Sequence, residues 1–126
     1  MDLELRIAVE FLLSFVVNKF KVTDTEAFIE TLLESLREKF KGHWYPDQPS
    51  KGSGYRCISL CDQLDNILVT AAQRTGFDVG MLSSSLPTRL DVFIDPREVS
   101  YRIGEFYISV VSLIFYIALV FLLLGS

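Results

Sequence analysis

The chain has few of the residues from which enzyme active sites and metal centres are built. Its 126 residues include two cysteines, Cys57 and Cys61, and a single histidine, His43. Residues four apart on a strand are separated by about 13 Å, which is beyond the reach of a disulfide. One histidine leaves a zinc site short of ligands and a nucleophile short of a base. We therefore expect an intracellular, non-enzymatic protein with reduced thiols, no catalytic residues, no metal and no cofactor.

Positive charge is also scarce. The sequence has 12 Lys and Arg against 16 Asp and Glu, which gives a net charge of −4 and a pI of about 4.9. This balance argues against nucleic-acid binding through the overall field of the protein. Residues 39–56 do mix lysines with aromatic residues, which could stack single-stranded bases. The alternative, favoured by the acidic balance, is that the aromatic residues fill the core and the lysines are solvated, so we expect no direct nucleic-acid binding.

No charged residue follows Glu105, so the chain divides into two parts. Residues 1–105 have the composition of a soluble domain, and residues 106–126 form a hydrophobic tail. As a helix, residues 106–124 would be about 28 Å long, enough to span the hydrocarbon core of a membrane. The tail is therefore a candidate transmembrane helix, with the domain on the cytoplasmic side. The other interpretation is that the tail comes from an alternative transcript or gene model and replaces the usual C-terminus. The sequence does not decide between a true anchor and a replaced C-terminus.

The first 105 residues predict a mixed fold of the α/β class, more narrowly α+β. Apolar residues recur at helical spacing in the first third, which predicts an antiparallel helix pair. Asp65 and Gly76 are residues that typically begin and end a helix. Alternating apolar residues predict a small, mainly antiparallel sheet. The predicted elements are helices over residues 3–20, 23–40, 65–75 and 78–84, and strands over residues 55–60, 90–95 and 99–103.

Phe93 is the residue whose environment the pattern leaves open. It lies with Asp91 and Asp95 on one side of its predicted strand, opposite the aliphatic residues. If the aliphatic side is the core, Phe93 is an exposed aromatic residue flanked by acids, as interface anchors are. If a helix covers its own side, Phe93 belongs to the core. Spacing alone does not decide between these interpretations.

Two long motifs stand out in the sequence, and the second of them contains the strand with Phe93. They read GHWYPDQPSKGSGYRCI at residues 42–58 and LDVFIDPREVSYRIGE at residues 90–105. In order and spacing they resemble box A (about residues 39–58) and box B (about residues 86–105) of the BTG/Tob anti-proliferative family. The start Met-Asp-Leu-Glu and the run EKFKGHWYP look nearer to the Tob branch than to the BTG branch. The resemblance covers residues 1–105 and implies a single BTG-type domain.

The resemblance implies an adaptor. Members of the family bind the Caf-type catalytic subunit of the Not-complex mRNA deadenylase, promote mRNA deadenylation and restrain proliferation. They are also transcriptional corepressors, which adds transcription factors as partners, and they act in cytoplasm and nucleus. Their partner surface uses an aromatic residue at the end of box A and a Trp-x-Asp in box B. The matching residues here are Tyr55, Phe93 and Asp95.

Two positions depart from the family pattern. Phe93 stands where the family usually has Trp, and Arg97 where it usually has an aromatic residue. Phe lacks the indole N–H and some contact area, so we expect binding to be weaker by about 1–2 kcal/mol. The alternative function is a tail-anchored membrane interaction protein built on a BTG-like domain.

Overall fold

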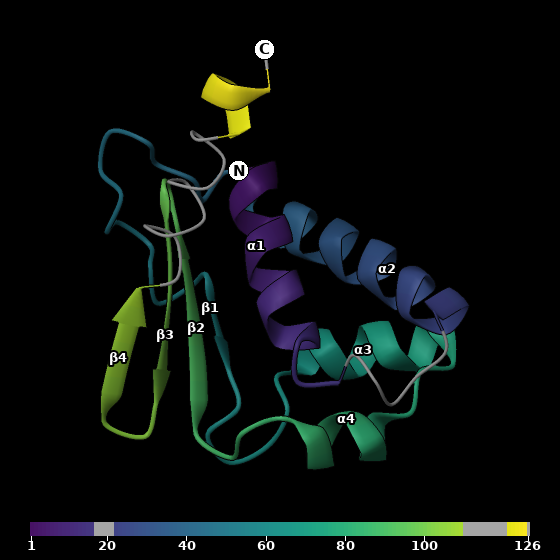
Figure 1. The fold of residues 1–126 in the computed structure, drawn as a ribbon. Coiled ribbons are helices and arrows are strands. Elements are labelled where there is room, and N and C mark those ends of the chain that lie inside the picture. The colour runs from purple at the N-terminus through teal and green to yellow at the C-terminus, as the bar shows by residue number, and fades with distance from the viewer. Residues whose placement is uncertain (17–21, 110–120, 126) are drawn as a thin grey trace.

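The protein is described by a computed structural model over residues 1–16, 22–109 and 121–125 (Figure 1). Its elements are α1 (Asp2–Leu13), α2 (Val22–Phe40), β1 (Cys57–Ser59), α3 (Asn66–Thr75), α4 (Val79–Ser85), β2 (Leu90–Asp95), β3 (Glu98–Ile103) and β4 (Phe106–Ser109). Helices and an antiparallel sheet are therefore combined in one α+β fold, as the sequence predicts.

The first two helices form the predicted pair. Arg37 near the end of α2 donates from Nε to Oδ1 of Asp2 at the start of α1, at 3.0 Å, so the two helices run in opposite directions. Helix α1 ends at Leu13, earlier than the predicted residue 20, and residues 17–21 lie outside the described residues. Leu3, in the first turn of α1, is 44% exposed.

The caps of α3 confirm the local prediction. The Asp65 side chain accepts from the amide of Ile67 at 3.1 Å, which satisfies one of the unpaired N–H groups at the helix start. Gly76 ends the helix with a φ of 71°, a left-handed conformation that glycine adopts without steric cost. Asp78 caps α4 in the same way, accepting from Met81 at 3.1 Å.

The strands form one sheet in the order β1-β2-β3-β4, and all neighbours are antiparallel. Helix α1 covers one face of this sheet (Figure 1). The Phe11 ring of α1 stacks on Tyr101 of β3 with the ring centroids 4.5 Å apart. Tyr101 pairs with Val92 of β2, which is completely buried, so these residues belong to the covered face. The other face is called the outer face below.

Strand β4 corrects the prediction of a hydrophobic helix beginning at Phe106. Residues 106–109 pair with β3, with Phe106 opposite Ile103, after a tight turn in which Gly104 has a φ of 61°. A continuous apolar run fits a strand as well as a helix, and here the unpaired edge of β3 decides for the strand. Residues 121–124 are helical, and residues 110–120 lie outside the described part of the chain. The division of the chain at residue 105 stays a prediction.

None of the helices described in residues 1–16, 22–109 and 121–125 has both the length and the apolar character that crossing a membrane requires.

Candidate partner-binding surface

Phe93 lies on the outer face of the sheet, and the aliphatic residues of its strand lie on the covered face. It occupies the middle of β2, opposite Cys57 on β1 and Ser100 on β3. Its neighbours Val92 and Ile94 are completely buried on the covered face, whereas Phe93 is only partly buried. The backbone alternation of the strand therefore turns the ring away from α1.

Tyr55 lies in the loop that leads into β1, the strand paired with β2. It precedes by two residues Cys57, the partner of Phe93 in the sheet, and it is 45% exposed. Its ring lies against the imidazole of His43, with the centroids 4.3 Å apart, and the Lys39 ammonium lies 5.1 Å from the ring centroid. Tyr55 is thus an accessible aromatic side chain with one positively charged neighbour, the Lys39 ammonium.

Asp95, the third expected site residue, is committed to an ion pair. Its Oδ1 accepts from Nη2 of Arg56 at 2.9 Å, and its side chain is 15% exposed. Arg56 itself is completely buried. Asp95 lies at the end of β2, two residues after Phe93.

The Arg56 guanidinium uses its full donor capacity, which is five N–H groups. The acceptors are the backbone carbonyls of Ile94 (2.7 Å), His43 (2.7 Å), Lys51 (2.8 Å) and Pro49 (3.0 Å), together with Oδ1 of Asp95 (2.9 Å). The guanidinium carbon also lies 5.3 Å from the centroid of the Trp44 ring. One buried side chain therefore joins the loop over residues 42–54 to the end of β2.

A second ion pair borders Phe93 on its other side. Asp91 is nearly buried and accepts from the Ser59 hydroxyl at 2.7 Å and from the Arg102 guanidinium. Burial opposes the charge of Asp91, but the hydrogen bonds from Ser59 and Arg102 outweigh it and hold the pKa below its usual value. The Arg102 guanidinium carbon lies 5.7 Å from the Phe93 ring centroid, so the pair shapes the surface around this ring.

The Cys57 thiol is held in its unreactive form. Burial, followed by the charges of Asp91 and Asp65, raises the pKa of Cys57 to about 12, so its thiol stays protonated at neutral pH. Cys61 is exposed and donates from Sγ to Asp91 at 3.4 Å. Within the described residues, no three His, Cys, Asp or Glu side chains gather as metal ligands would.

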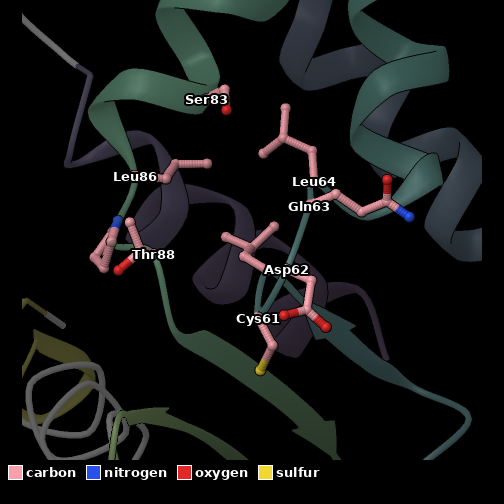
Figure 2. A pocket seen from close by; sticks show the side chains of 9 residues that line it. Cys61, Asp62, Gln63, Leu64, Ser83, Leu86 and Thr88 are labelled. Atoms are coloured by element: carbon pink, nitrogen blue, oxygen red, sulfur yellow. The ribbon is translucent and has the colours of Figure 1, made fainter.

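A small hollow of about 140 Å³ lies between the segment after β1 and the end of α4 (Figure 2). Asp62 and Leu64 line it from the first segment, and Ser83 and Leu86 from the second. The Cys61 thiol points away from Leu86, toward the strands and its acceptor Asp91 (Figure 2). The hollow thus lacks the convergent titratable groups that a catalytic pocket needs.

Comparison with known proteins identifies the family. The family model described as BTG family matches residues 1–112. The chain belongs to the BTG family. Human Tob2 and human Tob1 are each 42% identical to it over 105 residues, which are 83% of this chain and 30% of each relative. BTG1 of Gallus gallus is 42% identical over 104 residues, which are 81% of this chain and 61% of the relative.

The chain matches only part of the length of these relatives. This BTG-family chain spans about 30% of the length of the two Tob proteins and 61% of that of BTG1. The equal identities do not separate the Tob branch from the BTG branch. A solved structure of the C. elegans FOG-3 BTG/Tob domain has a TM-score of 0.77 and 23% identity, and covers 86% of this chain and 79% of that one. It confirms the fold, and the family is one of non-enzymatic proteins that act through protein interactions.

Sequence reasoning missed the two arginines that organise this surface. The contacts of Arg56 with the loop over residues 42–54 are made to backbone carbonyls. Carbonyl acceptors carry no signal in residue types. The pairing of Arg102 with Asp91 depends on the strand register, which places the two residues opposite each other.

Proposed function

We propose that this BTG-family chain is an adaptor that binds the Caf-type catalytic subunit of the Not-complex mRNA deadenylase and so promotes mRNA deadenylation, in cytoplasm and nucleus. Transcriptional corepression through transcription factors is the second role that the family resemblance suggests, and it would use the same capacity for protein binding. The observation that supports the adaptor role is the position of Phe93 on the face of the sheet opposite α1, opposite Cys57, which follows the exposed Tyr55 by two residues.

The side chains of Phe93 and Tyr55 have the chemistry of residues that bind a protein partner. Aromatic side chains supply large apolar contact area with little loss of rotamer freedom, and they dominate the binding energy of many interfaces. Phe93 is held between Cys57 and Ser100 in the sheet, so its backbone is ordered before binding. A rigid support of this kind lowers the entropic cost of association.

The test is a calorimetric titration of the full chain against the purified catalytic subunit, with a mild non-ionic detergent present because the tail carries no charge. We expect saturable binding in the micromolar range or tighter. Phe93→Ala and Tyr55→Ala should each weaken it by about tenfold or more, since hot-spot truncations cost on the order of 2 kcal/mol. Met81→Ala is the matched control, because Met81 is also an exposed apolar residue but lies on α4.

The outcome divides cleanly. If both Phe93→Ala and Tyr55→Ala bind the subunit as tightly as the unmodified chain, Tyr55 and Phe93 are excluded as the contact residues. An absence of binding by a folded chain, judged by its circular dichroism, would exclude the adaptor role itself.

A further inference from the structure

The Arg56 guanidinium makes most of the long-range side-chain hydrogen bonds to the loop over residues 42–54 that the structure describes. Short turns such as Gln48 N to Tyr45 O, at 3.0 Å, order the loop only locally. The carbonyls that accept from Arg56, by contrast, belong to residues spread along the loop, from His43 to Lys51. One further long-range hydrogen bond, from Nη2 of Arg97 to the carbonyl of Pro46 at 3.2 Å, also reaches the loop. Because three of the loop carbonyls converge on the rigid Arg56 guanidinium, its loss should loosen the loop.

The guanidinium in turn depends on Asp95. Arg56 is completely buried, and a buried charge that loses its partner is strongly destabilised. Oδ1 of Asp95 supplies the negative charge at 2.9 Å, from the end of β2. Asp95 is therefore part of the support of the loop, although its residue type and position in box B are those of a contact residue.

Tyr55 is the link from this support to the partner. It directly precedes Arg56, and its amide donates to the carbonyl of Gly52 at 3.1 Å. The amide of Arg56 donates to the carbonyls of Gly52 and Ser53 at 3.2 and 3.1 Å. The backbone at Tyr55 is thus hydrogen-bonded to the same loop whose carbonyls accept from the Arg56 side chain.

We propose that Asp95 is a positioning residue for partner binding. Its carboxylate holds the Arg56 guanidinium, the guanidinium shapes the loop over residues 42–54, and the loop sets the position of Tyr55. This inference rests on the proposed function, in which Tyr55 and Phe93 contact the partner. It differs from the family expectation, in which the aspartate of box B belongs to the contact surface itself.

The first arm of the test needs no partner. Hydrogen exchange, followed by mass spectrometry, is measured on the free full chain and on Asp95→Asn, Arg56→Lys and Asp47→Asn. Asp95→Asn removes the negative charge, and Arg56→Lys keeps the positive charge but loses the planar fork. Both should raise exchange in the loop over residues 42–54 on the order of tenfold, while α2 keeps its protection. Asp47→Asn is the matched control, because Asp47 is an exposed acid in the same loop.

The second arm measures affinity for the catalytic subunit. Arg56→Lys and Asp95→Asn should each weaken binding on the order of tenfold, although Arg56 is completely buried and cannot touch a partner. The double variant should bind no more weakly than the weaker single variant, since both changes release the same loop. Asp47→Asn should bind as the unmodified chain does.

Two results would overturn the inference. One is normal affinity of Arg56→Lys together with weak binding of Asp95→Asn, which would make Asp95 a direct contact. The other is unchanged loop exchange in the free Asp95→Asn chain, which would remove the mechanism. If the unmodified chain does not bind the subunit, the proposed function fails. The exchange arm still decides whether the ion pair supports the loop, and it does so with Asp95→Asn alone if Arg56→Lys does not fold.

Discussion

Asp91 on β2 and Arg102 on β3 lie directly opposite each other in the sheet and form an ion pair beside Phe93. Asp91 is nearly buried, whereas Arg102 is half exposed and reaches over the Phe93 ring. The pair thus gives an otherwise unfavourable buried carboxylate a partner and closes one side of the candidate surface.

The pair makes the stability of the chain depend on pH in a defined direction. Because the folded-state pKa of Asp91 lies below its ordinary value of 3.8, the stabilisation is present above that value and is lost as the pH falls through the lower folded-state pKa. We expect Asp91→Asn to lower the free energy of unfolding by about 1–2 kcal/mol at pH 7. The difference in melting temperature from the unmodified chain should shrink once the pH falls below 3.8. An undiminished difference in thermal melts at acid pH would contradict this account.

Gly52 is held between the loop backbone and the Arg56 side chain. Its φ is 75°, and a Cβ placed there would lie 3.0 Å from Nη1 of Arg56. We expect Gly52→Ala to lower the free energy of unfolding by about 1–2 kcal/mol, measured by urea denaturation. Gly42→Ala is the control, because Gly42 has a similar φ of 79° but a Cβ there meets no atom within 4 Å. Equal effects of the two substitutions would show that the contact with Arg56 is unimportant.

The two thiols should differ sharply in reactivity. Burial, together with Asp91, raises the pKa of Cys57 to about 12, while Cys61 is exposed. Iodoacetamide at pH 8 should therefore modify Cys61 and leave Cys57 intact in the folded chain, because the thiolate is the reactive form. Peptide mass spectrometry reads out both sites, and urea-unfolded chain should be modified at both. Modification of Cys57 at the rate of Cys61 would rule out the protected thiol.

Phe93→Trp tests the departure from the family pattern. An indole at this position adds apolar area and an N–H donor, so affinity for the deadenylase subunit should rise by about 1–2 kcal/mol, or roughly tenfold. Calorimetric titration of the full chain measures the change. The same substitution at Phe106, which is 77% exposed on β4, should leave affinity unchanged. Weaker binding by Phe93→Trp would mean that the surrounding surface is shaped for a phenyl ring.

Most elements of the fold can be predicted from local signals in the sequence. The caps at Asp65 and Gly76 act within a few residues, and the strand containing Phe93 is defined by alternation. The motifs of boxes A and B likewise lead to the family without any structure. The end of α1 and the strand at Phe106 were misjudged, because both lie in apolar runs whose conformation depends on which distant surface they meet.

The sequence by itself determined the α+β class, the helix limits at capping residues and the BTG family. Only the tertiary structure decided that Phe93 faces away from α1, that Asp95 is paired with a buried Arg56, and that residues 106–109 complete the sheet. The physical reason is separation along the chain. A helix cap or a strand alternation is a relationship between near neighbours. The contacts of Arg56 with Ile94 and Asp95 join residues almost forty positions apart, through atoms that residue type does not reveal.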